Sequence, residues 1–209
     1  MKIIKPSVEL IDAPEYADVL ALIDAAGRTC YKSALSETDK QREEFVRRAI
    51  KRGHESIIEH AKVTVRIICD RGVSHEIVRH RIASYSQEST RYCNYAGERF
   101  GEELTFIKPC FFQSRTPEEV HAEQIWRKAM CNAETAYFAM LGSGAKPEEA
   151  RSVLPNSVKT EIVVTMNFRE WRHFLKLRTD AAAHSQMREV AGMLLDMFKA
   201  KYPVFVEDI

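Results

Sequence analysis

The sequence has neither a long apolar run nor an excess of charge of one sign. No uninterrupted apolar stretch approaches the roughly 18–20 residues of a membrane span, and the apolar run in MKIIKPSVELID is too short for a secretory signal. Its 31 Lys and Arg face 30 Asp and Glu, for a net charge of +1. Coating nucleic acid draws on a large basic surplus. We therefore expect no membrane and no nucleic-acid partner.

Cysteine is scarce, and several motifs of catalysis are missing. The five cysteines are odd in number and never form a CxxC pair, which excludes a disulfide framework and a zinc knuckle. A cytoplasmic location fits that usage. There is no G-x-G-x-x-G or Walker loop and no G-x-S-x-G elbow, so the usual dinucleotide and serine-nucleophile fingerprints are absent. Cys93 could be a thiolate activated by Arg91, but a packing role is the preferred interpretation.

The histidines of GHESIIEH (53–60) do not have metal-ligand spacing. His54 and His60 lie six residues apart, whereas the ligands of a zinc-protease helix lie four apart and share one face. We therefore predict no metal site in this segment. His54 and Ser56 could still form hydrogen bonds with a ligand.

Length and composition predict a single domain over residues 1–209. The chain is 45% hydrophobic and 29% charged, as is ordinary for a globular protein with a sizeable core. Strand and helix patterns mix without a regular βαβ rhythm. The expected fold class is α+β, with a mixed sheet flanked by helices and no Rossmann unit.

Hydrophobic periodicity and capping signals place the elements. The expected strands cover 2–11, 62–69, 104–109 and 158–166. The expected helices cover 17–31, 37–52, 117–141, 147–153, 168–178 and 184–201. Thr116, Pro117 and Glu119 form a helix start with a capping box, and Asn167 is another predicted cap. Ser74 is expected to cap a short helix that carries residues 77–82, followed by a loop over 84–97.

Residues 78–95, VRHRIASYSQESTRYCNY, concentrate arginine, serine and tyrosine. The planar guanidinium of arginine can donate two parallel hydrogen bonds to a phosphate. A local positive charge on a nearly neutral chain favours a small anionic ligand. On a helix Arg79 and Arg81 would lie about 200° apart and could not grip one phosphate together. They would serve two ligands, or one ligand and a neighbouring subunit. A solvated basic turn is the alternative.

The segment FREWRHFLKLR (168–178) places an arginine on an apolar helix face. On a helical wheel, Phe174, Leu175 and Arg178 all lie within about 60° of Trp171, so Arg178 falls in the middle of that face. The opposite side carries Arg169, Arg172, His173 and Lys176. A buried arginine requires an anionic or polar partner.

Two explanations of Arg178 stay open on this geometry. One is an internal salt bridge to Asp180 or Glu161. The other is a guanidinium that points into a ligand pocket at the end of the helix.

The ordered motifs resemble the signature of flavin-dependent thymidylate synthases. Arg79-His80-Arg81 is followed, after seven residues, by Ser89 and then Arg91. Further motifs match in order and spacing, namely His54-Glu55-Ser56, Arg151 with Leu154-Pro155, Asn167-Phe168-Arg169 and Leu177-Arg178. The resemblance covers about residues 50–190, most of the chain.

The resemblance implies a reaction. dUMP would be reductively methylated to dTMP, with 5,10-methylenetetrahydrofolate as carbon donor and NADPH-reduced FAD as hydride source, giving tetrahydrofolate. No enzyme nucleophile is needed. Arg178 would instead be the catalytic residue, activating the uracil by favouring loss of its N3 proton.

The resemblance also implies site residues, and no metal among them. The implied cofactor-binding residues are His54, Ser56, Arg79, His80, Arg81, Gln87, Asn167, Arg169 and His173. The implied substrate-binding residues are Glu76, Ile77, Val78, Arg79, Gln87, Glu88, Ser89, Thr90, Arg91, Arg151 and Arg178. Glu76 stands where the family often has Gln, and Gln87 and His173 stand where other members can carry Glu and Asn.

The expected assembly is a homotetramer with active sites shared between subunits. A 24.0 kDa chain without a Rossmann unit has little surface to enclose FAD, dUMP and a folate alone, and the family is homotetrameric. Two alternatives come from other classes. One is an RNA-binding module that uses Arg79, Arg81, Arg91, Tyr92 and Tyr95. The other is a structural protein whose arginines pair only internally.

Overall fold

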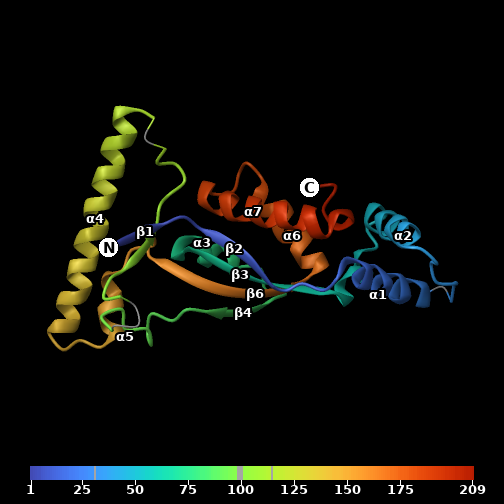
Figure 1. The fold of residues 1–209 in the computed structure, drawn as a ribbon, viewed down its shortest axis with the longest axis horizontal. Helices are drawn as coiled ribbons and strands as arrows, with labels where there is room; N and C mark the ends of the chain where they lie inside the picture. The colour runs from blue at the N-terminus through green and yellow to red at the C-terminus, as the bar shows by residue number, and fades with distance from the viewer. Residues whose placement is uncertain (31, 98–100, 114) are drawn as a thin grey trace. The chain divides into compact units, whose positions relative to one another are not determined.

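Small sheets flanked by helices form the fold, as the α+β prediction requires (Figure 1). The computed structural model describes residues 1–30, 32–97, 101–113 and 115–209. The larger sheet has the strand order β2-β3-β6-β4, and a second sheet pairs β1 with β5. This order differs from that of doubly wound dinucleotide-binding folds.

The described chain divides into two units, each assembled from three segments. Unit 1 comprises Met1–Ser7, Ile67–Arg79 and Ser86–Ile162. Unit 2 comprises Val8–Arg66, His80–Tyr85 and Val163–Ile209. The expectation of one domain over 1–209 stays a prediction.

A proline divides the first predicted strand. β1 (Lys2–Ile4) and β2 (Ser7–Asp12) replace the single strand expected over 2–11. Pro6 lies between them and has no backbone N–H for a ladder. In unit 1, β1 runs parallel to β5 (Thr105–Ile107), with Ile3 opposite Phe106.

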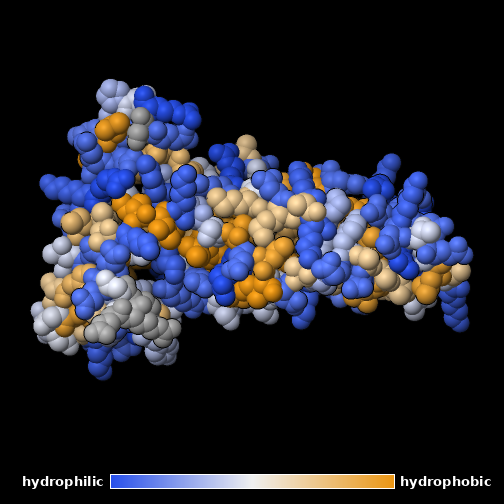
Figure 2. Space-filling model, in the orientation of Figure 1, coloured by the Kyte–Doolittle hydropathy of each residue, from blue (hydrophilic) through white to orange (hydrophobic). Residues whose placement is uncertain are grey.

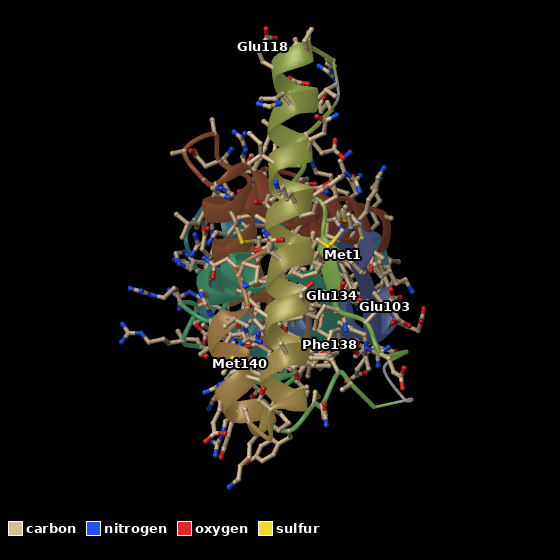
Figure 3. All side chains as sticks on the ribbon, turned by 90° about the vertical axis from the view of Figure 1, so that its left-hand side faces the viewer. Met1, Glu103, Glu118, Glu134, Phe138 and Met140 are labelled. Carbon is tan, nitrogen blue, oxygen red and sulfur yellow. The ribbon has the colours of Figure 1, made fainter. Side chains whose placement is uncertain are left out.

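The long helix of unit 1 is α4 (Pro117–Gly142), and it begins where the sequence predicts. Thr116 Oγ1 accepts from the Glu119 backbone N–H at 3.2 Å. The Glu119 carboxylate accepts from the Arg115 N–H at 2.8 Å rather than from Thr116, so the reciprocal half of the predicted capping box is displaced by one residue. Figure 3 shows α4 facing the viewer, with Met1 and Glu134 beside its middle. The Met1 amino group lies 3.1 Å from the Glu134 carboxylate.

A compact apolar cluster lies against α4 in unit 1. Leu104, Phe106 and Tyr137 are fully buried in it. Phe138 and Met140, labelled in Figure 3, are partly buried and pack against the cluster. Met130 and Tyr137 of α4 are buried in the same cluster as Phe106 of β5, so one side of the helix is apolar and packed.

The short helix α3 (Arg71–Ile77) is capped differently from the prediction. Asp70 Oδ1 accepts from the Val73 N–H at 2.8 Å, whereas Ser74 is buried inside the helix. The helix ends at Ile77, so the expected helix through 82 is wrong and the expected placement of Arg79 and Arg81 on different helix faces does not apply.

The other predicted elements of unit 1 are largely confirmed. α5 (Pro147–Ala150) and the 3-10 helix η3 (Arg151–Val153) cover the helix expected over 147–153. The loop expected over 84–97 is wrong at its start, where β4 (Ser84–Gln87) forms the edge of the larger sheet.

Helices make up most of unit 2. They are α1 (Tyr16–Thr29), α2 (Asp39–Lys51), α6 (Phe168–Thr179) and α7 (Ser185–Lys201), with 3-10 turns η1 (Glu55–His60) and η4 (Pro203–Phe205). Figure 1 shows α1 beside α2 and α6 beside α7. The helix expected over 17–31 is confirmed through residue 29, and Tyr31 lies outside the described residues.

The two central strands confirm their predicted period. β3 (Lys62–Asp70) and β6 (Lys159–Asn167) bury alternate residues, the pattern of strands with one packed face. In unit 2, Trp171 of α6 is fully buried and its Nε1–H donates to the Val63 carbonyl at 3.1 Å. This bond ties α6 to the sheet.

Hydrophilic residues cover most of the face drawn in Figure 2, with hydrophobic patches between them. Of the described large hydrophobic residues of unit 2, Ile82 is the most exposed, at 69%. Among the described helices, none is both long and apolar enough to cross a membrane.

Two helical glycines of unit 2 should respond oppositely to the same substitution. A Cβ on Gly27 of α1 would meet the Phe45 ring at 2.5 Å, whereas a Cβ on Gly192 of α7 would meet nothing within 4 Å. We expect Gly27→Ala to destabilise the protein by about 1–3 kcal/mol through overpacking. Gly192→Ala should stabilise it by about 0.5–1 kcal/mol. Chemical denaturation of both variants measures this, and equal shifts in the free energy of unfolding would contradict the packing at Gly27.

Candidate functional site

A cavity in unit 2 opens beside the start of α6. Its volume is about 480 Å³. Asn167 caps the helix, because its Oδ1 accepts from the Glu170 N–H at 2.9 Å. The cap places Arg169 and His173, one turn apart, on the exposed side of α6. The residues that line the cavity are Glu55, Glu59, Ile82, Asn167, Arg169, Glu170, Arg172, His173 and Lys176. Three predicted flavin-binding residues, Asn167, Arg169 and His173, thus share one cavity.

The charges on the cavity wall largely compensate one another. Arg169 lies 2.6 Å from the Glu59 carboxylate, and that hydrogen bond raises the pKa of the guanidinium. Arg172 lies 3.3 Å from Glu55. The exposed imidazole of His173 and the side chain of Ile82 complete the wall. A surface of paired charges, an imidazole and an aliphatic group suits a polar heterocycle rather than a free cation.

Arg178, His80 and Glu170 form a hydrogen-bonded chain in unit 2. Arg178 Nε lies 3.2 Å from His80 Nε2, and His80 Nδ1 lies 3.1 Å from the Glu170 carboxylate. The side chains of His80 and Glu170 are only 2% and 9% exposed. Burial lowers the pKa of His80, and the charge of Arg178 acts in the same direction, against the opposing effect of Glu170.

A metal ion is a poor fit to this cluster. The ligand atoms of His80, Glu170 and His173 lie within 4.8 Å of one another. The His80–Glu170 hydrogen bond already uses two of these groups, however, and the Arg178 guanidinium beside the imidazole disfavours a second positive charge.

The fully buried arginine of α6 is Arg172, which the sequence interpretation assigned to the polar side. Arg172 is 1% exposed, whereas Arg178 is half-buried. The buried arc of the helix is wider than predicted and extends from Glu170 through Trp171 to Arg172, about 200°. Arg178 lies within this arc, but it is close to the end of the helix, where less protein covers it.

Arg172 joins α6 to two distant segments of unit 2. Its guanidinium lies 2.7 Å from the Asp208 carboxylate and also donates to the Phe205 carbonyl. Glu55 of η1 is its second anionic partner. The sequence interpretation did not predict that Glu170 and Arg172 are buried, because periodicity alone does not show which partners a helix will contact.

Both carboxylates proposed as partners of Arg178 contact other groups of the protein. Asp180 Oδ1 accepts from the Ala182 N–H at 2.8 Å, and Glu161 lies 3.7 Å from Lys159. The partner that Arg178 Nε has in unit 2 is the imidazole of His80, which the sequence interpretation did not propose.

His54 and Ser56 line a second cavity of unit 2, of about 610 Å³. Its wall includes Gly27, Arg28, Phe45 and Arg52 from α1, α2 and the turn after them. The structure thus separates these two predicted cofactor contacts from the cavity that holds Asn167. Arg81, the remaining predicted contact of unit 2, is exposed.

The predicted substrate-binding loop of unit 1 is held by its own side chains. Gln87 Nε2 donates to Ser74 Oγ at 2.9 Å and to Thr160 Oγ1 at 3.1 Å. The Glu88 carboxylate accepts from Tyr95 at 2.7 Å and from Lys159 at 2.8 Å. These bonds fix the backbone from which the following residues project.

Arginines surround the end of that loop. Arg151 lies 3.4 Å from Thr90 Oγ1, and Arg91 Nε lies 3.7 Å from Glu148. The Ser89 hydroxyl accepts from the Arg91 N–H at 3.3 Å. Arg91 and Arg151 are both exposed, so this group can meet an anion.

The predicted residues at the end of α3 differ in accessibility. Ile77 is fully buried and Glu76 is half-buried, whereas Val78 and Arg79 are exposed. The side chain of Ile77 therefore packs in the core, and only its backbone could reach a ligand.

Two observations bear on the alternative roles of unit 1. Tyr95 is 7% exposed, so its ring cannot stack on a nucleobase as an RNA-binding module would require. Cys93 packs against the buried cluster of unit 1, which confirms its interpretation as a packing residue.

Comparisons with known proteins agree on one family. The profile of the family described as thymidylate synthase complementing protein, Thy1, matches residues 9–204. A flavin-dependent thymidylate synthase of Geobacter sulfurreducens is 36% identical over 91% of this chain and 82% of its own length. One of Pyrococcus furiosus is 38% identical over 84% of this chain and 70% of its own length. A structure of the UMP/dUMP methylase PolB from Streptomyces cacaoi, bound with 5-Br dUMP, is similar with a TM-score of 0.82 and 25% identity. That similarity covers 99% of this chain and 96% of PolB.

The Arg172–Asp208 pair should give the protein acid-sensitive stability. Its hydrogen bond to Arg172 holds the pKa of the Asp208 carboxyl well below its usual 3.8. Because the folded-state pKa is depressed, the stabilisation is fully present above pH 3.8 and is lost as the pH falls towards the folded-state pKa. Asp208→Asn should cost about 1–2 kcal/mol at pH 7, below the full cost of breaking a buried pair, because water screens the 43%-exposed carboxylate.

Urea denaturation of the wild type and Asp208→Asn between pH 7 and pH 3 measures this difference. Glu9→Gln is a matched control, because Glu9 pairs with Arg66 while 63% exposed, and it should change stability by less than about 0.5 kcal/mol. A difference for Asp208→Asn that stays constant down to pH 3 would contradict the assignment.

Proposed function

Since the chain belongs to the thymidylate synthase complementing protein family of flavin-dependent thymidylate synthases, we propose that it converts dUMP to dTMP by reductive methylation. 5,10-Methylenetetrahydrofolate donates the carbon and becomes tetrahydrofolate. The observation that carries the proposal is a half-buried arginine, Arg178, linked through His80 and Glu170 to a cavity that holds three of the family's flavin-binding positions.

The lining of the unit 2 cavity fits a flavin. Arg169 and His173 present exposed donors, the Asn167 amide lies beside them, and Ile82 offers an aliphatic contact. Exposed Arg81 suits a phosphate. When bound, FAD reduced by NADPH supplies the hydride. The chain's residues hold and orient the cofactor, and its donors suit both the polar edge of a flavin ring and a pyrophosphate.

Arg178 is the residue proposed to activate the pyrimidine. A guanidinium stays protonated at neutral pH and only donates hydrogen bonds. Beside the uracil it favours the form that has lost the N3 proton, because it stabilises the negative charge that remains on the ring. That charge raises the electron density at C5, where the new carbon is attached. No thiol has to attack the ring, in accord with the packing role of Cys93.

The loop of unit 1 is proposed to bind dUMP. The planar guanidinium groups of Arg91 and Arg151 suit the nucleotide phosphate, and Ser89 supplies a hydroxyl. The predicted contact Thr90 is buried, and its hydroxyl lies against Arg151 instead. The internal bonds of Glu88 hold the loop in place before substrate arrives. Preorganisation of this kind lowers the ordering cost of binding.

A cytoplasmic homotetramer with active sites shared between subunits completes the proposal. The cavities at Asn167 and at His54 are separate within one chain, and a neighbouring subunit could supply the remaining walls. Mass photometry should give about four times the 24.0 kDa subunit mass. A fully active monomer would contradict the shared site.

The first prediction concerns the cofactor and the reaction. Purified protein incubated with FAD and freed of excess should keep flavin absorbance, and NADPH should bleach it. Addition of dUMP and methylenetetrahydrofolate should yield dTMP. UMP belongs in the same assay, because the structurally similar PolB is described as a UMP/dUMP methylase. A colourless protein that shifts RNA in a salt-dependent manner would instead support the RNA-binding alternative.

The second prediction concerns Arg178. Arg178→Ala should keep the fold and the flavin but lose kcat by about 100-fold or more, because removing one preorganised donor to developing charge has a cost of that order. Arg178→Lys keeps the positive charge but loses the planar guanidinium, so its kcat should lie between those of the wild type and Arg178→Ala. Steady-state kinetics with flavin absorbance as the control separates these effects. Wild-type turnover in Arg178→Ala would remove Arg178 from the mechanism.

A further inference from the structure

Both ring nitrogens of His80 are committed within unit 2. Nε2 lies 3.2 Å from Arg178 Nε, and Nδ1 lies 3.1 Å from the Glu170 carboxylate. A ring with both nitrogens engaged has no polar atom left for a flavin. The direct cofactor contact that the family resemblance implies for His80 is therefore not open to its side chain in this arrangement.

The proton positions follow from the chemistry of the partners. Arg Nε–H can only donate, so His80 Nε2 must be the unprotonated nitrogen that accepts. A neutral imidazole then carries its proton on Nδ1, which donates to Glu170. The opposite tautomer would turn an Nε2–H towards the Arg178 N–H and leave Nδ1 facing a carboxylate with no proton between them. Two mismatched pairs in a buried site would be costly.

We propose that Glu170 is a positioning residue which, through the tautomer of His80, orients the guanidinium of Arg178 for its action on the pyrimidine. The inference rests on the proposed function and deepens it. Glu170 is 7% exposed, so its charge acts on His80 through protein rather than through water. The first and last residues of the hydrogen-bonded chain, Glu170 and Arg178, both belong to helix α6.

The surroundings of His80 hold the imidazole in place. Phe174 and His173 flank the ring, with centroids 4.9 and 5.3 Å away. The Tyr85 hydroxyl donates to the His80 carbonyl. Among the described residues, the charged or titratable side chains that act on the imidazole are Glu170, Arg178 and His173, while Tyr85 contacts the backbone of His80.

Protonation of His80 would break the chain at a defined point. A proton on Nε2 removes the acceptor of the Arg178 Nε–H and places two positive groups in contact. The pKa of His80 is lowered, so turnover should fall only well into the acid range, below the usual 6.5 of a histidine. Glu170 favours the protonated imidazole, so loss of its charge should move this acid limb to still lower pH.

The decisive variant is Glu170→Gln, which keeps the shape but removes the charge, and it replaces a group that only accepts hydrogen bonds with an amide that can also donate, which weakens the tautomer preference. We expect kcat to fall by about 10- to 100-fold, since a displacement of about 1 Å at a reacting group can cost on the order of 100-fold. The KM for dUMP and the flavin content should change less than about twofold. Glu123→Gln is the matched control: Glu123 is also 7% exposed and paired with cations, in unit 1, and its kcat and pH profile should match the wild type.

A double-mutant cycle tests whether Glu170 acts through Arg178. In an Arg178→Lys background, Glu170→Gln should lower kcat by less than about threefold, because the guanidinium that Glu170 orients is no longer present. A full loss of about 10- to 100-fold in that background would overturn the proposal. Wild-type kcat in Glu170→Gln, or an acid limb that does not move, would overturn it as well.

The tautomer can be read without turnover. ¹⁵N-histidine labelling of the seven histidines, with His80 assigned from a His80→Asn sample, should show Nδ1 protonated and Nε2 bare at pH 7.5. Glu170→Gln should weaken that preference and raise the Nε2–H fraction, and Glu123→Gln should keep the wild-type tautomer. An Nε2–H tautomer in the wild type would overturn the proposal even in an active enzyme. A wild type that makes no dTMP but shows the Nδ1–H tautomer would instead refute the proposed function alone.

Discussion

Buried charge on α6 is the constraint on which unit 2 depends. The helix buries Glu170 and Arg172 on either side of Trp171, and each charge would be too costly without a partner. Arg172 therefore forms ion pairs with Asp208 near the end of the chain and with Glu55 of η1. Glu170 forms a hydrogen bond with His80. One helix thus joins segments that are far apart in the sequence.

The same requirement decides which polar side chains are buried and which remain exposed to solvent. His80 and Gln87 carry the marks of ligand-binding residues in the sequence, yet their side chains satisfy buried groups of the protein itself. Arg91, Arg151, Arg169 and His173 are exposed. Under the proposed function, the buried polar side chains set the geometry of the site and the exposed ones would contact the ligand.

Strong local signals were enough for many elements, and weak ones were not. The alternation in β3 and β6, the Asn167 cap and the start of α4 at Thr116 were predictable, because each depends on neighbours in the sequence. The end of α3 and the strand β4 were not. β4 exists through pairing with β6, a strand from a distant part of the chain, and just beyond β4 the Glu88 N–H donates to the Glu161 carbonyl at 2.8 Å. The residues around β4 in the sequence do not indicate that pairing, because strand formation depends on the partner strand.

By itself the sequence determined the fold class, which follows from periodicity and capping, and the order and spacing of the motifs that resemble the family. Only the tertiary structure decided which arginine of α6 is buried. Arg172 meets Asp208 across 36 positions and Glu55 across 117, whereas Arg178 meets His80 across 98. A helical wheel orders side chains around an axis, but burial depends on what packs against each side, and those partners come from elsewhere in the chain.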